Sequence, residues 1–309
     1  MGSLEPIYYW RYTLKSRAAL NAVSERTEHE GALIKIGEGH ACIHPWPELG
    51  DKSLDEQLKL LSAEQSSTLI IAAKDCAKMD GYLRMEGLTA NRIFPESHWL
   101  VRQGDDPQFA KSEGFEFAKI KGTPDAERTR GLLREWSGTG LKVRLDFNEC
   151  LEVGEFLPYW NELSSPEREG IDFIEDPEKW TSVGWKKIRE AGVPLAVDRD
   201  SGNRASPGDV IIAKPARPDW FFEKDARVVV TSYMDHPIGQ MYAAVRASDW
   251  RREMGPENLL TCGLLTHRCF EDDEFIEQIR CDGPRLLPVE GTGLGFDDLL
   301  EKLPWKCLS

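Results

Sequence analysis

The chain has 309 residues, of which 40% are hydrophobic and 30% charged, values ordinary for a globular protein with one large domain or a large and a smaller one. Its formal net charge of −14 excludes a protein built to bind nucleic acid or anionic membranes, because phosphate groups recruit lysine and arginine. No apolar run approaches the roughly 20 residues that span a bilayer, and seven scattered cysteines without a CxxC pair favour a reducing compartment, so we expect a cytoplasmic protein.

The N-terminal part of the chain predicts a mixed α+β unit. Its helical stretch begins at Ser53, a plausible N-cap, with Glu56 three residues later, a spacing that permits a capping box. The predicted elements are strands over 6–15 and 30–39, a loop rich in Pro, Gly and His over 39–53, and a helix over 53–81.

From about residue 91 the pattern changes, and short apolar strands alternate with polar or helix-like stretches. This alternation predicts a parallel sheet of βα units. Eight units fit a closed (β/α)8-type barrel, with a doubly wound open sheet as the alternative. The predicted strands are NRIF (91–94), FEFAKIK (115–121), LKVRLDF (141–147), IDFIED (171–176), PLAVD (194–198), DVIIAK (209–214), RVVVTS (227–232) and LLTCGLL (259–265). The tail over 285–305 predicts a strand, a glycine-rich turn and a short helix.

Charged residues close five consecutive strands of this series. Lys119 and Lys121 end the second strand and share one face, because strand side chains alternate. The next four strands end in Asp146, Glu175, Asp198 and Lys214. The C-terminal strand ends of a barrel meet at one mouth, where three unpaired carboxylates would repel one another. An all-oxygen ligand set suits Mg²⁺, so we predict a magnesium site flanked by lysines. The short step from Asp198 to Lys214 predicts a stunted or missing helix after the fifth strand.

This arrangement predicts proton abstraction next to a carboxylate. Magnesium makes the α-carbon of a bound carboxylate more acidic, and a lysine of lowered pKa can take the proton. Lys119 is placed to lower the pKa of Lys121, since neighbouring cations disfavour each other's charge. The expected partner is a small-molecule carboxylate substrate, with neither nucleic acid nor membrane involved; the sequence gives no oligomeric state.

Five motifs, "AKIK", "RLDFN", "FIEDP", "AVDRD" and "IIAKP", occur in this order and together resemble the signature of the enolase superfamily, muconate lactonising subgroup. Within it the chain is most similar to the o-succinylbenzoate synthases of menaquinone biosynthesis. The resemblance implies a modified TIM barrel, (β/α)7β, over 90–285, and an α+β capping domain formed by 1–89 with 286–309. It also implies Mg²⁺-dependent syn dehydration of 2-succinyl-6-hydroxy-2,4-cyclohexadiene-1-carboxylate to 2-succinylbenzoate through an enediolate.

The resemblance assigns roles to matching positions. Lys121 matches the acid/base residue, Lys119 its partner and Lys214 the lysine on the opposite face. The matching magnesium ligands are Asp146, Glu175 and Asp198, and the residues matching those around the substrate are Arg144, Asn148, Ser232 and Gly263. The loop over 37–50 resembles a mobile loop that closes over the substrate. The seventh-strand segment departs from the family, which is richer in serine there, by carrying Tyr233, Asp235 and His236.

Each assignment has a simpler alternative. Any one of the three carboxylates could cap a helix, the two strand-end lysines could guard an exposed edge, and Arg144 could pair with an acid in the core. The alternative activities are an N-acylamino acid racemase or a dipeptide epimerase, and, from another class, a binding barrel without catalysis. Epimerases similar to this subgroup carry a DxD pair at the eighth strand, where this chain reads "CGLLT".

Overall fold

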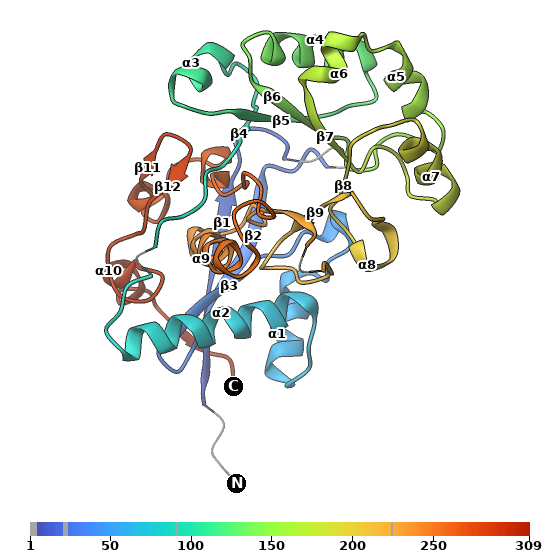
Figure 1. The fold of residues 1–309 in the computed structure, drawn as a ribbon. Helices are drawn as coiled ribbons and strands as arrows, with labels where there is room; N and C mark the ends of the chain where they lie inside the picture. Colours follow the sequence, from blue (N-terminus) through green and yellow to red (C-terminus); the bar gives the residue numbers. More distant parts are fainter. Residues whose placement is uncertain (1–4, 21–23, 91, 224) are drawn as a thin grey trace.

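A computed structural model describes residues 5–20, 24–90, 92–223 and 225–309 (Figure 1). Its largest sheet has seven parallel strands in the order β10-β9-β8-β7-β6-β5-β4, and a second sheet has four strands in the order β13-β1-β2-β3. A two-stranded hairpin, β11-β12, is separate. Within the described residues no helix is both long and apolar enough to cross a membrane.

The N-terminal unit packs an antiparallel sheet against two helices, as the sequence predicts in outline. Its elements are β1 (Ile7–Lys15), β2 (Glu28–Ile36), β3 (Gly39–Ile43), a 3-10 turn η1 (Pro47–Leu49), α1 (Leu54–Ser62) and α2 (Thr68–Met85). The capping box between Ser53 and Glu56 is confirmed. The single helix predicted over 53–81 is wrong, because Ser67 caps a second helix by accepting a hydrogen bond from the Ile70 amide.

The loop predicted over 39–53 is also wrong in its first part, which is strand β3. β3 pairs antiparallel with β2 and is almost entirely buried. It lies directly on α2, and a Cβ added at Gly39 would come within 1.8 Å of the Ala77 carbonyl oxygen. The glycine that suggested a loop is therefore the residue that lets the strand approach the helix.

The C-terminal tail completes this unit. It contributes α10 (Asp297–Leu300) and β13 (Lys306–Cys307), and β13 adds to the edge of the sheet beside β1. Asp80 of α2 holds the tail in place, since its buried carboxylate accepts hydrogen bonds from the amides of His40 and Leu294 and from Arg84 Nε, each at 2.7 Å. A capping domain built from both ends of the chain is confirmed, whereas boundaries at residues 89 and 286 stay a prediction.

We expect Asp80→Ala to destabilise the protein by roughly 3 to 5 kcal/mol, because it leaves two buried amides without an acceptor and removes one of the two carboxylates that pair with Arg84, the other being Asp297. The midpoint of urea unfolding measures this. Asp75→Ala is the matched control, since Asp75 lies exposed on the same helix and its loss should change stability by less than about 0.5 kcal/mol. Equal midpoints for the two variants would contradict the role given to Asp80.

The parallel sheet forms the barrel, with helices around it (Figure 1). Its strands are β4 (Trp99–Leu100), β5 (Phe117–Lys121), β6 (Lys142–Asp146), β7 (Ile171–Glu175), β8 (Leu195–Val197), β9 (Val210–Ala213) and β10 (Arg227–Val230). The helices are α3 (Pro107–Ser112), α4 (Ala126–Ser137), α5 (Phe156–Glu162), α6 (Ser165–Gly170), α7 (Ser182–Glu190), α8 (Ser201–Arg204) and α9 (Pro237–Met254). The remaining short elements are η2 (Thr266–Cys269), η3 (Ile276–Gln278), β11 (Cys281–Asp282) and β12 (Arg285–Leu286).

Two of the eight predicted barrel strands are not strands. In NRIF, residues 92–94 form none and Asn91 lies outside the described residues, so the first barrel strand is β4. The predicted strand over 259–265 is instead an extended segment that closes the ring. The Gly263 amide donates to the Val230 oxygen at 2.8 Å, and the His98 amide donates to the Cys262 oxygen at 2.8 Å. This closure excludes the doubly wound alternative. The helix after β8, α8, is four residues long, which confirms the stunted helix.

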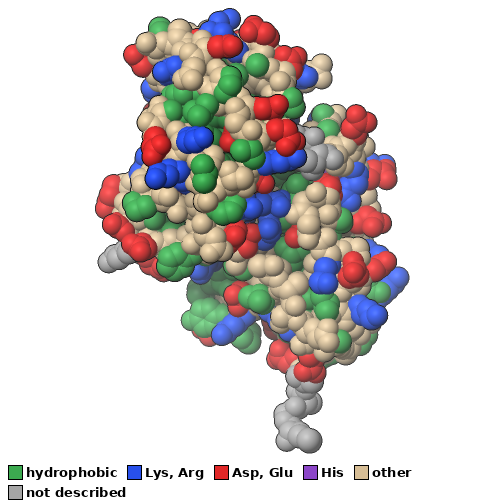
Figure 2. Space-filling view, turned by 90° about the vertical axis from the view of Figure 1, so that its right-hand side faces the viewer, with side chains coloured by type: hydrophobic (Ala, Val, Ile, Leu, Met, Phe, Trp, Pro, Cys, Tyr) green, Lys and Arg blue, Asp and Glu red, His purple; other side chains and the backbone are tan. Residues whose placement is uncertain are grey.

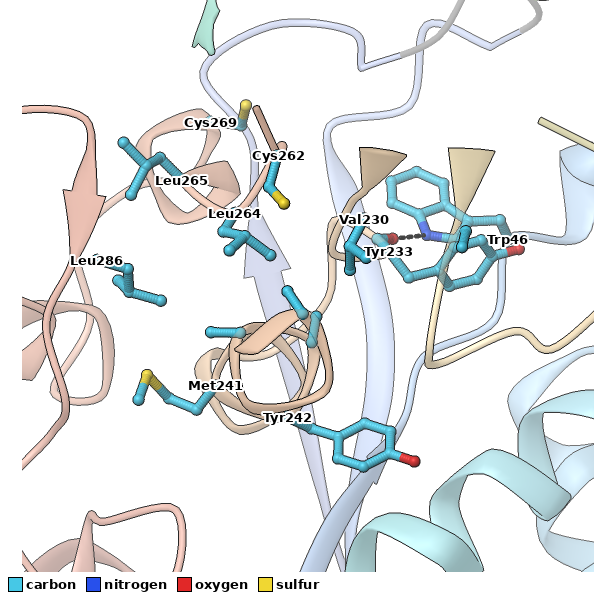
Figure 3. Packing of buried hydrophobic residues seen from close by; sticks show 14 of the residues in the cluster. Trp46, Val230, Tyr233, Met241, Tyr242, Cys262, Leu264, Leu265, Cys269 and Leu286 are labelled. Carbon is cyan, nitrogen blue, oxygen red and sulfur yellow. Dashed lines mark hydrogen bonds between the residues drawn. The ribbon is translucent and has the colours of Figure 1, made fainter. Parts of the chain in front are cut away.

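One continuous core joins the barrel to the capping domain. Figure 3 shows Leu264 of the closing segment directly above α9, the helix that carries Met241, with Trp46 of the capping domain packed near Tyr233. Because apolar side chains of both parts belong to the same buried cluster, the capping domain is fixed over one end of the barrel. Figure 2 shows acidic and basic side chains interspersed on one face of the molecule, without a broad surface of a single sign.

Candidate active site

The ends of β5, β6 and β7 bring two lysines and two carboxylates into contact. Lys121, Asp146 and Glu175 stand at one level because they are register partners on neighbouring parallel strands. Lys119 Nζ lies 2.7 Å from Glu175 Oε2 and 2.8 Å from Asp146 Oδ2. Lys121 Nζ lies 2.6 Å from the same Asp146 oxygen. The two ammonium groups therefore share one carboxylate oxygen, and the edge-guard alternative for this pair fails.

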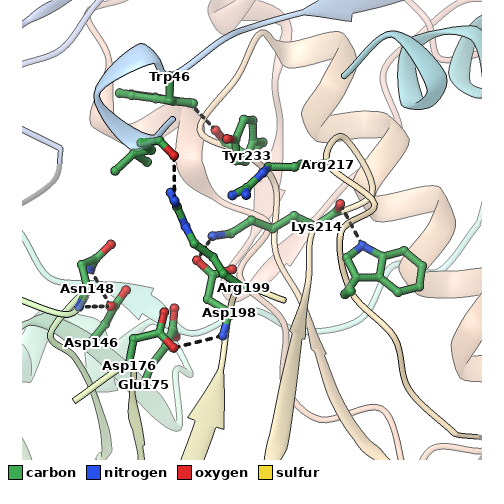
Figure 4. Close-up of polar contacts among 12 residues, drawn as sticks. Trp46, Asp146, Asn148, Glu175, Asp176, Asp198, Arg199, Lys214, Arg217 and Tyr233 are labelled. Carbon is green, nitrogen blue, oxygen red and sulfur yellow. Dashed lines mark hydrogen bonds and ion pairs between the residues drawn. The ribbon is translucent and has the colours of Figure 1, made fainter. Parts of the chain in front are cut away.

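Two strands further along the sheet, Lys214 forms an ion pair with Asp198 (Figure 4). All six residues predicted from the strand ends thus gather at the C-terminal mouth of the barrel. Lys121 and Lys214 approach from β5 and β9, which stand on opposite sides of the ring. Each lysine is bound to a carboxylate, so the charges at this mouth are arranged as alternating pairs.

Burial governs the protonation of this cluster. The side chains of Asp146, Glu175 and Asp198 belong to residues exposed by only 2%, 1% and 7%. Burial, with Asp146 next, raises the pKa of Glu175 to about 7. Burial would also raise the pKa of Asp146, but the ammonium groups of Lys119 and Lys121 outweigh it and hold that pKa well below its usual range. The lowered pKa of Asp198, against its burial, comes from the ion pair with Lys214.

Lys119 is held as a cation. Burial would lower its pKa, but Asp146 and Glu175 outweigh burial and raise the pKa of Lys119 above its usual value. The hypothesis drawn from the sequence, that Lys119 lowers the pKa of Lys121, requires such a positive charge on Lys119. The tuning of Lys121 by Lys119 stays a prediction.

Several residues that follow these strands have left-handed backbone. Asn148, Asp176 and Asp200 have φ values of 47°, 44° and 48°, a conformation that costs energy for residues other than glycine and often marks functional sites. Asn148 uses it to bind Asp146, whose Oδ1 accepts a hydrogen bond from the Asn148 amide at 3.0 Å. Asn148 thus contacts Asp146 and lines the cavity, and its role around the substrate stays a prediction.

A fourth carboxylate, Asp176, was not singled out from the sequence although it belongs to the "FIEDP" motif. It is 4% exposed, and its Oδ1 accepts a hydrogen bond from the Asp198 amide at 3.3 Å. Burial, followed by the charges of Asp198 and Glu175, raises the pKa of Asp176 well above its usual range. Because side chains alternate along a strand, Asp176 is expected to face away from Glu175. Only the structure shows that its carboxylate lies beside Asp198.

The donor set at this mouth fits magnesium. It offers carboxylate oxygens alone, the ligands that Mg²⁺ prefers, and Oδ1 of Asp198 is buried without a hydrogen-bond partner. As placed, the described residues contain no group of three or more His, Cys, Asp or Glu side chains that could hold a metal ion. Lysine ammonium groups occupy the carboxylate oxygens instead, so a cation would exchange for these ion pairs.

A cavity opens above this cluster. Predicted residues that line it are Lys119, Lys121, Asn148, Asp198, Lys214, Ser232 and Gly263. Lining residues outside every segment that the sequence assigned to the site are Leu20, His98 and Leu100. Ser232 and Thr266 share a hydroxyl hydrogen bond of 2.6 Å on one wall. The three residues outside the assigned segments carry no motif, and only chain folding brings them here, whereas Leu49, Thr231 and Thr266 line the cavity from the predicted loop and from the predicted seventh- and eighth-strand segments.

Arg144 does not reach the cavity. Its guanidinium lies between the rings of Phe117 and Phe173, 4.7 Å from each, and its Nε donates to Asp172 at 2.8 Å. It also contacts His98, whose ring does line the cavity. Arg144 is therefore separated from the cavity by His98. It pairs with Asp172, which was the alternative given for it in the sequence analysis.

The loop over 37–50, predicted to close over the substrate, has two parts with different structures. Its first half is the buried strand β3, so it is no loop, while the segment around Trp46 and Leu49 reaches the cavity. Hydrogen bonds fix this segment to the barrel (Figure 4): Arg199 donates to the Leu49 oxygen at 2.7 Å and Trp46 Nε1 to the Tyr233 oxygen at 2.9 Å. The Trp46 bond ends on the backbone oxygen of Tyr233, and the Tyr233 side chain, a departure from the family pattern, adds a second anchor by donating its hydroxyl hydrogen to Asp51 Oδ2 at 2.8 Å.

Comparison with known proteins agrees with this geometry. A family model described as "O-succinylbenzoate synthase, N-terminal domain" matches residues 7–83. The o-succinylbenzoate synthase of Bdellovibrio bacteriovorus is 35% identical, over 97% of each chain. The L-Ala-D/L-Glu epimerase from Bacillus subtilis has a similar fold, with a TM-score of 0.72 at 18% identity, over 94% of this chain and 98% of that one. The dipeptide epimerase from Cytophaga hutchinsonii, solved with Mg and D-Ala-L-Val, has a TM-score of 0.71 at 16% identity, over 99% of both chains.

Proposed function

The chain belongs to the o-succinylbenzoate synthase family of the enolase superfamily, and on that premise we propose that it is a Mg²⁺-dependent o-succinylbenzoate synthase serving menaquinone biosynthesis. Family membership makes it a lyase. The observation that carries the finer proposal is the pair of lysines, Lys121 and Lys214, that line one cavity from opposite sides above buried carboxylates. Seven free cysteines support a reducing, cytoplasmic setting.

The proposed metal ligands are Asp146, Glu175 and Asp198. Magnesium held there would withdraw charge from the substrate carboxylate and so make the neighbouring C–H bond more acidic. Asp176 supports this shell by accepting a hydrogen bond from the Asp198 amide. Asn148 orients Asp146 through its backbone amide.

Lys121 is the proposed acid and base of a syn dehydration of 2-succinyl-6-hydroxy-2,4-cyclohexadiene-1-carboxylate. As a neutral amine it takes the α-proton, and as an ammonium it returns a proton to the departing hydroxyl group. The C–H and C–O bonds break, a ring C=C bond forms, and the products are water and aromatic 2-succinylbenzoate. The Lys214 side chain, which pairs with Asp198, stabilises the negative charge that develops on the substrate carboxylate. Ser232 and Gly263 line the wall that would face the acyl chain.

Racemisation of an N-acylamino acid is the second candidate. The same opposed lysines could remove a proton from one face of an α-carbon and return it from the other, and structural neighbours include epimerases. For dipeptides the missing DxD pair at the closing segment argues against this activity, since that segment reads "CGLLT".

One assay separates the candidates. The purified protein with Mg²⁺ should consume the cyclohexadiene substrate, followed as loss of its ultraviolet absorbance, with kcat in the ordinary range of about 1 to 10³ s⁻¹. N-succinylamino acids, followed by polarimetry or deuterium exchange, should react much more slowly. Exchange without any dehydration would reverse the order of the two candidates.

A further inference from the structure

His98 lines the cavity although it belongs to none of the motifs found in the sequence. It immediately precedes β4, is 5% exposed, and lines the same cavity as the catalytic lysines. Its Nδ1 lies 3.1 Å from Arg144 Nη1. The guanidinium that makes this contact is itself fixed, because it also donates to Asp172 and to the Thr261 carbonyl oxygen at 2.6 Å.

This contact determines the tautomer of His98. A guanidinium has donors only and stays protonated in proteins, so the Nδ1 atom that faces it must accept. Burial, followed by the charge of Arg144, lowers the pKa of His98 well below its usual range, and the ring is therefore neutral. A neutral ring with an accepting Nδ1 carries its proton on Nε2.

The Nε2 side of the ring faces space that Gly263 keeps open. A Cβ added at Gly263 would come within 2.8 Å of His98 Cε1 and within 3.0 Å of Nε2. Among the described residues, no protein acceptor is hydrogen-bonded to Nε2. Nearby Thr231 also lines the cavity, and its buried hydroxyl has no hydrogen-bond partner. One neutral polar atom, His98 Nε2, thus remains free at a wall of a cavity that is otherwise rich in charged pairs, whereas the Thr231 hydroxyl lies buried and its methyl group is toward Gly263.

We propose that His98 Nε2–H forms a neutral subsite that binds an acceptor oxygen of the substrate's acyl chain, and that Arg144 is the positioning residue that fixes the His98 tautomer. The identity of the ligand rests on the proposed function, in which that oxygen belongs to the keto or terminal carboxylate group of the succinyl chain. Gly263 has a matching role, since any side chain there would fill the space in front of the ring.

His98→Asn isolates the proposed contact. The asparagine amide can take the place of Nδ1 and so keep an acceptor for Arg144, but it is too short to offer a donor at the position of Nε2. His98→Gln is the matched control, because its longer side chain can place an NH2 group near that position. We expect His98→Asn to raise KM about tenfold or more with little change in kcat, and His98→Gln to restore most of the loss.

Ligand titration by calorimetry assigns the effect to the acyl chain. His98→Asn should weaken binding of the product 2-succinylbenzoate by about tenfold but leave the weaker binding of benzoate unchanged. Equal affinities of wild type and His98→Asn for 2-succinylbenzoate would overturn the subsite. A wild type that neither turns over the cyclohexadiene nor binds 2-succinylbenzoate would instead overturn the proposed function.

The tautomer is tested apart from activity. Nitrogen-15 NMR of the histidine-labelled protein should show the His98 proton on Nε2, and Arg144→Met should mix the two tautomers, whereas Arg144→Lys should preserve the Nε2–H form. A proton found on Nδ1 in the wild type would overturn the inference, whatever reaction the enzyme catalyses. A merely structural role of Arg144 would lower stability without changing the tautomer.

Discussion

Replacing Lys121 with alanine is expected to lower kcat for dehydration by roughly 10²- to 10⁴-fold, the usual contribution of a positioned general acid or base. Lys121 is the better exposed lysine of its strand, with a side chain 30% exposed to the cavity, whereas Lys119 is buried between two carboxylates. Of the two, Lys121 is therefore the one with direct access to a substrate in the cavity. Loss of absorbance of the cyclohexadiene measures the rate.

Two controls separate proton transfer from charge and folding. Lys121→Arg keeps a cation beside Asp146 but cannot act as a base near neutral pH, so it should be as inactive as the alanine variant. Lys142→Ala, at the exposed start of the neighbouring strand β6, should keep full activity. Asp146 retains its contact with Lys119 at 2.8 Å when Lys121 is lost, so thermal unfolding should change little. More than a tenth of wild-type activity in Lys121→Ala would contradict the assignment.

The six charged residues of the mouth could be found from the sequence because each ends an apolar strand. An isolated Asp146 or Lys214 predicts little, but strand ends in one parallel sheet converge, so their order along the chain becomes proximity in space. The same reasoning misplaced Arg144. It shares a face with Asp146 by alternation, yet it lies two residues earlier on the strand, and that distance places it deeper in the barrel beside Asp172.

The residues that sequence reasoning missed lie outside such strands. β3 reads as a loop because its buried state depends on the close approach of Gly39 to α2, a contact between distant parts of the chain. His98 precedes a strand of only two residues, and Leu20 reaches the cavity from the segment between β1 and β2. Local sequence patterns carry no information about contacts between residues far apart in the chain, so only the folded structure shows them.

Removal of divalent metal is expected to abolish turnover, and added Mg²⁺ to restore it. The carboxylates of Asp146, Glu175 and Asp198 are nearly inaccessible to solvent, so water cannot replace a metal in stabilising charge on the substrate. EDTA treatment followed by titration with Mg²⁺ measures both the loss and its recovery. Isothermal calorimetry of Mg²⁺ binding to the treated protein gives a readout that does not depend on activity.

Asp198→Asn tests the metal site without removing the metal. The amide keeps the size of the side chain but loses the charge, so we expect weaker Mg²⁺ binding and a fall in kcat of roughly 10²- to 10⁴-fold, as expected for the loss of several kcal/mol of charge stabilisation. Asp200→Asn is the matched control: Asp200 is exposed and left-handed, a conformation that asparagine adopts well. Because Lys214 pairs with Asp198, a purely structural role predicts lower stability with unchanged Mg²⁺ affinity, whereas a ligand role predicts weaker affinity in calorimetry. Unchanged affinity in Asp198→Asn would therefore remove Asp198 from the metal site.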